Sequence, residues 1–454
     1  MVDKTQTHFG VLFLVLGIAT FLRFYNLEFM EFKGDEGFNL LKALQFVQQG
    51  VIPLTSAVSS TGVHEPPIFM YILALLLLFS TNPLFITGFV ALLNSLGVGL
   101  CYLIVRRLFD RNAALFAAAF YAVNPWQILF SRKIWTQNLL APFILLFLYL
   151  AFTGIVDKRN KRIVAACFIL GLTLQLHMSA MYFVLVALMI LIVDWKKISK
   201  PHLVAGIGFF LCPFIPYLIF MVQDGFGGFA TAAAVTTGGE GGFRLESLKI
   251  PFTLISTQGL EYSLGQSYLA FEETVLRITL LDYLAMGALV AGLVYMLASR
   301  RRFSLLIGLW PILGLVYFSV INVSIYVHYF HSLLPVFFIL LGVFAGRITS
   351  AKSGIWRGIA YTLTGALLMY QLTFSFQFLR FIGDTECIHG DYGAPYARRL
   401  ESLNQTVQRY PTTVENLRRI HRDSCFCVKC DPLATIYIVK HLDEDFGYWP
   451  KLKH

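Results

Sequence analysis

Two acidic clusters stand in the first hydrophilic stretch of the chain, and they are its first candidates for chemistry. Asp35 and Glu36 form one cluster, and about thirty residues later Glu65 stands between His64 and a double proline. Paired carboxylates can act as a general base or hold a cation against an anionic substrate. The alternative is helix capping, because apolar residues recur every third position from there to Gly50, as in an amphipathic helix with an acidic start.

Other segments carry side chains that could bind an anion. These candidates are Arg132, Lys133, His177, Arg244, Tyr329 and His331. Arginine suits phosphate best, because its planar guanidinium donates two parallel hydrogen bonds. For Arg132 and Lys133 the alternative is snorkelling toward lipid headgroups. His177 lies between apolar runs, where an ionisable group indicates function, although a capping histidine at a helix end is the alternative.

A divalent metal is a further option for this chemistry. His64, Glu65 and His328 could hold such an ion beside a substrate phosphate. No short spacing of ligands enforces this arrangement, so the ion stays unnamed.

The composition of the chain that carries these side chains is typical of a membrane protein. Hydrophobic residues make up 57% and charged residues 14% of the 454 positions, where soluble proteins carry about 25% charged residues. Apolar stretches such as 9–25, 83–105 and 303–320 approach the roughly 20 residues that cross a bilayer. The net charge of +10 does not indicate nucleic acid, because the basic residues stand in short clusters between apolar runs.

The basic clusters also predict the topology. They lie at 106–111, 158–162, 196–200, 300–302 and 347–357, and cytoplasmic loops are rich in Lys and Arg. All of them fall inside only if the segment 66–80 does not cross the membrane. We therefore predict an all-α polytopic membrane protein with about eleven spans, juxtamembrane helices and an internal amino terminus. Residues 25–80 and 223–274 then become external loops, together with the surroundings of Arg132, His177 and His331.

The long external loop and the tail have their own composition. The loop contains the glycine-rich run 236–242, which suits either a mobile binding element or a plain connector. Residues 1–379 are expected to form the membrane domain and 380–454 an external tail, with a β-prone run at 434–439 that predicts a small α/β appendage. Disulfides, a zinc site or free thiols remain open for the tail cysteines, Cys387, Cys425, Cys427 and Cys430.

The same segments resemble a known family. The Asp35–Glu36 pair, Gly50 and Pro53, and Glu65-Pro-Pro through Tyr71 resemble the dolichyl-phosphate-mannose protein mannosyltransferase-like branch of the GT-C membrane glycosyltransferases. That branch includes the bacterial aminoarabinose transferases that act on lipid A. Three further segments fit the pattern, and they are 124–133, 175–177 and 329–335. The likeness covers roughly residues 10 to 346.

The resemblance implies an activity. Such proteins move a sugar from a polyprenyl-phosphate carrier to an acceptor hydroxyl of a glycan, lipid or protein on the extracytoplasmic face, typically with inversion. It marks Asp35 as the catalytic residue, with Glu36 and Glu65 beside it, and implies a multi-pass protein of a bacterial or archaeal plasma membrane. The aminoarabinose transferases have a lysine between the glutamate and the double proline, whereas here Glu65 is followed directly by Pro66. The phosphate contact is therefore expected from another cation, with Arg132 foremost.

Two other classes compete with this interpretation. A transporter or flippase of lipid-linked sugars would carry out no covalent chemistry, and such proteins usually have repeated halves and midplane sites, neither of which is evident. A phosphotransferase or ligase would act on similar lipids and pass phosphate to the acceptor instead of sugar.

Overall fold

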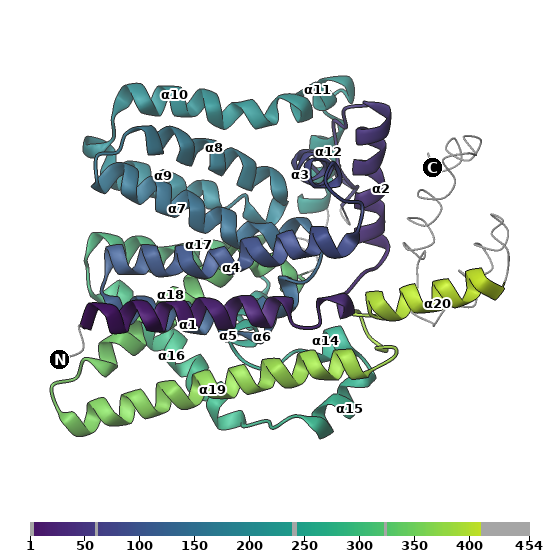
Figure 1. Ribbon diagram of the computed structural model, residues 1–454. Coiled ribbons are helices and arrows are strands. Elements are labelled where there is room, and N and C mark those ends of the chain that lie inside the picture. Colours follow the sequence, from purple (N-terminus) through teal and green to yellow (C-terminus); the bar gives the residue numbers. More distant parts are fainter. Residues whose placement is uncertain (1–3, 60–61, 238–242, 322–324, 410–454) are drawn as a thin grey trace.

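The computed structural model describes residues 4–59, 62–237, 243–321 and 325–409, and all of its regular elements are helices (Figure 1). The long helices run roughly parallel and form one bundle. They are α1 (Lys4–Phe24), α4 (Pro83–Leu108), α5 (Arg111–Val123), α7 (Leu140–Val156), α8 (Lys161–Leu176), α9 (Phe183–Asp194), α10 (Lys200–Leu211), α16 (Thr279–Ala298), α17 (Arg302–Val320), α18 (Leu334–Thr349) and α19 (Gly354–Asp384).

The bundle has the dimensions and composition of a membrane domain. Six described helical segments are long and apolar enough to cross a bilayer, and they are Pro83–Leu108, Thr136–Val156, Met178–Lys197, Lys200–Gln223, Thr279–Ala298 and Arg302–Val320. The helices α1, α5, α8, α18 and α19 pack among them. The protein is a multi-pass integral membrane protein as predicted, and the number of about eleven spans stays a prediction.

One end of the bundle holds the predicted basic clusters. Successive bundle helices alternate in direction, so the turns after α4, α7, α9, α16 and α18 all lie at the end that carries the amino terminus (Figure 1). The charges there are partly paired: Arg107 contacts Asp157, and Asp194 accepts from Arg302 and lies 3.7 Å from Lys197. The loops that carry the candidate site residues are therefore at the opposite end.

Close packing of α5 against α18 stabilises the centre of the bundle. A Cβ atom on Gly342 would lie 2.3 Å from the backbone nitrogen of Ala117, and one on Gly346 would lie 2.8 Å from that of Ala113. Only glycine and alanine at these crossing points let the two backbones approach so closely, which is typical of helix packing in lipid. This contact places the end of α5, and the loop that follows it, next to the start of α18.

The opposite end of the bundle is covered by short helices. They are α2 (Gly34–Gln49), α3 (Ile68–Leu77), α6 (Pro125–Phe130), α11 (Ile215–Gln223), α12 (Gly227–Thr237), α13 (Ile250–Ile255), α14 (Glu261–Leu264), α15 (Ser267–Thr274) and α20 (Tyr396–Arg409). Short 3₁₀ segments join them: η1 (Leu27–Phe29), η2 (Thr136–Leu139), η3 (Met178–Ala180), η6 (Leu245–Leu248) and η7 (Val327–Ser332); η4 (Trp195–Lys197) and η5 (Cys212–Phe214) complete the set.

The predicted helix after Asp35 is α2, and it lies across the bundle direction (Figure 1). It ends at Gly50, whose φ of 68° is the left-handed conformation that glycine adopts most easily. The segment 66–80 forms α3, which has ten residues. At 1.5 Å per residue α3 is about 15 Å long, half the thickness of the hydrocarbon core, so it cannot cross alone, as expected.

The chain continues after α19, which ends at Asp384, into α20. The glycine-rich residues 238–242 lie outside the described part of the chain. So do the β-prone run 434–439 and the cysteines at 425, 427 and 430. The α/β appendage, the division at residue 380 and the cysteine pairing therefore stay predictions, and the described residues 385–409 contain a helix and no strand.

Candidate functional site

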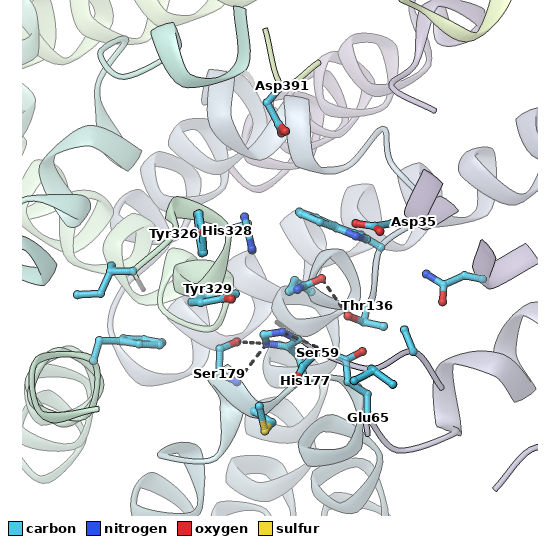
Figure 2. A pocket seen from close by; sticks show the side chains of 18 of the residues that line it. Asp35, Ser59, Glu65, Thr136, His177, Ser179, Tyr326, His328, Tyr329 and Asp391 are labelled. Carbon is cyan, nitrogen blue, oxygen red and sulfur yellow. Dashed lines mark hydrogen bonds and ion pairs between the residues drawn. The ribbon is translucent and has the colours of Figure 1, made fainter. Parts of the chain in front are cut away.

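A cavity of about 630 Å³ opens at the short-helix end of the bundle, which is within the range of small-molecule sites. Several segments contribute to it: the start of α2, the segment before α3, residues 135–137, the turn after α8 and the segment from α17 to η7, together with Tyr262 and Asp391. Among its lining residues are the predicted site residues Asp35, Glu65, His177, His328 and Tyr329 (Figure 2). The sequence predicted these five, and folding brings them to one place.

Asp35 stands in the first turn of α2 with its side chain exposed to the cavity. No hydrogen bond or ion pair with another residue described by the structure occupies its carboxylate. The next residue, Glu36, points the other way: it is fully buried and accepts a hydrogen bond of 2.7 Å from the Lys33 backbone N–H. Of the two acids, Glu36 thus caps the helix, and Asp35 is available for a ligand.

Glu65 is held in place by a short backbone pairing. Its N–H donates to the Ala57 carbonyl at 2.9 Å, and its carbonyl accepts from the Ser56 N–H at 2.8 Å. A double proline follows and starts α3, which fixes the direction of the chain. The hydroxyl of Tyr71 donates to the Pro53 carbonyl at 2.7 Å, so two residues of the family pattern stabilise this same loop.

His177 ends α8 and faces Glu65 across the cavity (Figure 2). Its Nδ1 accepts a hydrogen bond of 3.1 Å from the Ser179 backbone N–H. A neutral imidazole with an accepting Nδ1 must carry its proton on Nε2, so the tautomer follows from this bond. Nε2 lies 3.6 Å from Oε1 of Glu65, and its N–H can donate to that carboxyl group.

Burial favours the neutral form of both side chains in this pair. Burial lowers the pKa of His177 to about 4, so the imidazole is neutral near pH 7. Burial and the nearby charge of Asp35 raise the pKa of Glu65 to about 7. Glu65 is therefore partly protonated at neutral pH, and a raised pKa of this kind is typical of functional sites.

A lysine that was not among the sequence candidates provides the fixed positive charge of the cavity. Lys33 is the one lysine or arginine among the described lining residues. Its Nζ lies 2.6 Å from Oε1 of Glu31 and 3.0 Å from Oδ1 of Asp391, which comes from the tail segment after α19. Although burial alone would lower the pKa of Lys33, the charges of Glu31 and Asp391 raise it, so this ammonium stays protonated.

Lys133 belongs to the layer directly beneath the cavity. Its Nζ donates to Oε1 of Glu31 at 2.6 Å and lies 3.4 Å from Oε1 of Glu36. It also lies 3.5 Å from the centre of the Trp135 ring, which is a cation–π contact. Lys133 is 3% exposed and does not line the cavity, so it supports Trp135 and the acidic residues from below.

An aromatic wall, consisting of Trp135, Tyr326, His328 and Tyr329, forms one side of the cavity. The His328 ring stacks on Tyr326 with an interplanar angle of 8° and lies 4.5 Å from the Trp135 ring, measured between centroids. Tyr329 meets His328 edge to face. Burial lowers the pKa of His328, so this ring is neutral at pH 7 and extends the wall.

Arg132 was the expected phosphate ligand, but it does not line the cavity. It is 3% exposed, and its guanidinium donates to the carbonyls of Tyr25 and Asn26 and, at longer range, to those of Leu22 and Arg23. The last carbonyls of a helix have no partner within it, and a cation there also complements the helix dipole. Arg132 thus caps α1 and fixes the turn at Asn26.

Three other candidates also lie away from the cavity lining. His331 is fully buried, its ring lies 4.0 Å from that of Phe130, and burial lowers its pKa to about 3. Arg244 lies at the start of η6, where its backbone N–H donates to the Ser319 carbonyl at 2.9 Å. The His64 ring packs on Phe220, with 5.0 Å between centroids.

The expected metal ligands are not gathered at one point. His64 pairs with Val58 in a short extended bridge, and successive side chains of extended chain point to opposite sides. Glu65 therefore faces the cavity, while His64 faces α11. No group of three His, Cys, Asp or Glu side chains among the described residues could hold an ion.

Lys33 and Asp391 are the charged lining residues that the sequence interpretation missed. Lys33 had a usable signal, because it stands two residues before Asp35 in the same loop. Asp391 had none, since its approach depends on backbone contacts between the tail segment and residues 262–266.

Comparisons with known proteins concern the fold of the chain. Residues 64–220 match the family model of dolichyl-phosphate-mannose-protein mannosyltransferases. The structure resembles ArnT from Cupriavidus metallidurans, solved without ligand and bound to undecaprenyl phosphate, with TM-scores of 0.60 and 0.57. The identity is 16%, over 95% of this chain and 88% of ArnT.

A more distant likeness is to the oligosaccharyltransferase AglB from Archaeoglobus fulgidus, solved with an inhibitory peptide and a dolichol-phosphate. Its TM-score is 0.52 at 13% identity, over 95% of this chain and 62% of that protein. No curated protein sequence matches the chain. At these identities the solved structures show the fold. The predicted resemblance to the mannosyltransferase-like and aminoarabinose-transferase-like branch of the GT-C glycosyltransferases is confirmed, and the chain has the fold of that group.

Proposed function

We propose that the chain transfers a sugar from a polyprenyl-phosphate carrier to the hydroxyl of an acceptor. One observation supports this proposal most strongly: Asp35 presents a carboxylate with no described partner to a cavity that also holds Glu65 and His177. The likeness to ArnT and AglB, whose structures contain undecaprenyl phosphate and dolichol-phosphate, supports the class of donor. The cavity faces the extracytoplasmic side, because the basic turns stand at the other end of the bundle.

The proposed reaction is a single displacement at the anomeric carbon of the sugar. The acceptor oxygen forms a bond to that carbon while the bond to the phosphate oxygen breaks, and the bonding pair leaves with polyprenyl phosphate. Asp35 orients the acceptor hydroxyl and accepts its proton as the bond forms. Because attack and departure occur on opposite faces of the sugar, the product has inverted configuration.

Glu65 and His177 assist the same step in a different way. In the proposed reaction the Nε2–H of the neutral imidazole, now 3.6 Å from Oε1 of Glu65, moves into hydrogen-bond range and orients that carboxyl group. In its protonated form, Glu65 donates a hydrogen bond to the donor, where an ionised carboxylate would repel the phosphate. The aromatic wall of Trp135, Tyr326, His328 and Tyr329 presents flat apolar faces to a sugar ring.

The test is a transfer assay with the purified full chain, a panel of synthetic polyprenyl-phosphate sugars and candidate acceptors. The expected product carries the sugar on the acceptor in inverted configuration, and polyprenyl phosphate appears in equal amount. Recovery of every donor intact, but moved across a vesicle membrane, would instead identify a transporter. Transfer of phosphate to the acceptor would identify a phosphotransferase.

A further inference from the structure

We infer that Lys33 binds the phosphate of a prenyl phosphate, and that Asp391 is an internal anion which occupies Lys33 until that phosphate displaces it. This inference deepens the proposed function and rests on it for the identity of the lipid. It assigns a binding residue and a competing residue to the cavity.

The hydrogen-bond capacity of Lys33 makes a competition necessary. An ammonium group has three donors, and the contacts of Nζ are Oε1 of Glu31, Oδ1 of Asp391 and the Asp391 backbone carbonyl. An incoming phosphate can therefore bind Lys33 strongly only where one of these acceptors leaves. Charged hydrogen bonds of this kind are the strongest that the cavity can offer an anion.

Glu31 is the acceptor that stays. Its side chain is 9% exposed, and the same Oε1 also accepts from Lys133 at 2.6 Å. Although burial would raise the pKa of Glu31, the charges of Lys133 and Lys33 lower it, so it remains an anion. If this carboxylate moved, the buried Lys133 would lose its ion pair with Glu31. Such a loss is costly in a site of low dielectric.

Asp391 is the acceptor that can leave. Its side chain is 42% exposed, and its carboxylate points into the cavity (Figure 2). Ion pairs with a solvent-exposed partner are weak, because water screens the charges. Water can solvate the carboxylate after it turns away, so its displacement carries little penalty.

The backbone on both sides of Asp391 is fixed, so only its side chain has to move. The next residue, Tyr392, donates from its N–H to the Ser263 carbonyl at 2.8 Å and from its hydroxyl to the Phe29 carbonyl at 2.6 Å. Two residues earlier, the His389 carbonyl accepts from the Gln266 N–H at 3.1 Å. Lys33 can thus keep its contacts to Glu31 and to the Asp391 carbonyl while the carboxylate is exchanged for phosphate.

The exchange also preserves charge. A sugar linked to a prenyl chain through one phosphate is a diester with a single negative charge, which equals the charge of the carboxylate it replaces. When the sugar leaves, the phosphate becomes a monoester and gains negative charge. Lys33 then interacts more strongly with the product phosphate than with the donor, which favours departure of the leaving group.

The test is binding of farnesyl phosphate to the full chain by isothermal titration calorimetry, in the absence of any sugar. We expect Lys33→Met to bind about tenfold more weakly, in line with the loss of a charge-assisted hydrogen bond. We expect Asp391→Asn to bind about two- to fivefold more tightly, which is the fold-change that corresponds to an exposed ion pair. In Lys33→Met/Asp391→Asn the gain should vanish, because both substitutions act on one interaction.

Controls separate this effect from charge and folding. Asp384→Asn removes a negative charge from the same end of the molecule, on a residue whose side chain is 72% exposed, and it should not change affinity. Lys33→Arg keeps the charge and should retain most of the binding. Farnesol should not respond to any variant, and inorganic phosphate should bind more weakly than farnesyl phosphate. If inorganic phosphate bound equally well, the lipid part of the inference would be wrong.

The inference is overturned by unchanged or weaker binding in Asp391→Asn, or by wild-type binding in Lys33→Met. Its failure is distinguishable from failure of the proposed function. Sugar transfer that depends on Asp35, with no response to Asp391→Asn, would leave the function standing and remove the competition. The predicted binding pattern in a chain that transfers no sugar would support the competition at Lys33 and contradict the proposed function.

Discussion

The Nε2 atom of His177 lies 3.6 Å from Oε1 of Glu65, while the Nδ1 atom on the other side of the ring accepts from the Ser179 N–H. The backbone bond fixes the tautomer, and the tautomer places the ring proton on the nitrogen nearest Glu65. Asp35 shares the cavity with this pair. Burial and the nearby Asp35 raise the pKa of Glu65 to about 7, and several measurements can detect this shift.

The first prediction concerns pH. The pKa of Glu65 is raised to about 7, so its protonated form, which the proposed reaction needs, is lost as the pH rises through that value. Transfer should therefore fall above about pH 7. In Glu65→Gln the side chain stays neutral, and this alkaline limb should disappear from the profile of kcat/KM. An identical limb in the variant would contradict the role of Glu65.

The same shift predicts a component of stability. Because the folded state holds the Glu65 proton more tightly than the unfolded chain does, the contribution is present below the usual glutamate pKa and is lost between about pH 4.5 and 7. Glu65→Gln should lack this loss. Thermal unfolding of wild type and variant at pH 5 and pH 8 measures this contribution. A stability difference between the two proteins that is the same at both pH values would contradict the raised pKa.

The second prediction concerns His177. In His177→Phe the ring remains, but the donor to the ionised form of Glu65 is lost, so the pKa of Glu65 and the alkaline limb should move to higher pH. The rate below pH 7 should fall about ten- to a hundredfold, because Glu65 is no longer oriented. His202 provides a control: it bonds Ser199 at the amino-terminal end of the bundle, and His202→Gln should leave the profile unchanged.

The third prediction separates capping by Arg132 from phosphate binding. Arg132→Met leaves the carbonyls at the end of α1 without their donor, which should lower the free energy of unfolding by about 1–3 kcal/mol. Protein that remains folded should bind farnesyl phosphate with wild-type affinity. Thermal unfolding and calorimetry on one preparation measure both quantities, and a large loss of affinity at unchanged stability would restore Arg132 as a phosphate ligand.

The fourth prediction concerns the contact of α5 with α18. Gly342→Ala places a Cβ atom 2.3 Å from the Ala117 nitrogen, so the helices must separate, at a cost of about 1–3 kcal/mol in unfolding free energy. Gly358→Ala on α19 is the matched control, because its Cβ would meet nothing within 4 Å. In thermal unfolding in one detergent, the Gly358→Ala control should be at least as stable as wild type. Equal stability of the two variants would contradict the packing of α5 on α18.

Sequence patterns predicted the features that depend on neighbouring residues. The helix from Asp35 to Gly50 was predicted from its apolar spacing and its glycine. The basic clusters predicted which turns share one end of the bundle. Asp35, Glu65, His177, His328 and Tyr329 each stand in a short motif, so they could be named before their positions were known.

Features that depend on distant contacts could not be predicted. Asp391 reaches the cavity because Gly265, with a φ of 52°, lets the backbone at His389 approach it closely. Arg132 was expected to bind phosphate because arginine suits that anion, yet the turn at Asn26, whose φ is 50°, brings the carbonyls of Asn26 and of the end of α1 to its guanidinium. His331 was also a candidate, but it is buried in η7 against Phe130.

The fifth prediction tests the central claim that Asp35 handles the acceptor hydroxyl. Asp35→Asn keeps the size of the side chain and removes its basicity, and it should lower kcat for sugar transfer about 10²- to 10⁴-fold. Affinity for farnesyl phosphate should stay within about twofold, and Asp384→Asn should behave as wild type in both assays. The most direct measurement is therefore transfer and binding by Asp35→Asn in one preparation. Loss of transfer with retained binding is the predicted result, and wild-type transfer would contradict the account.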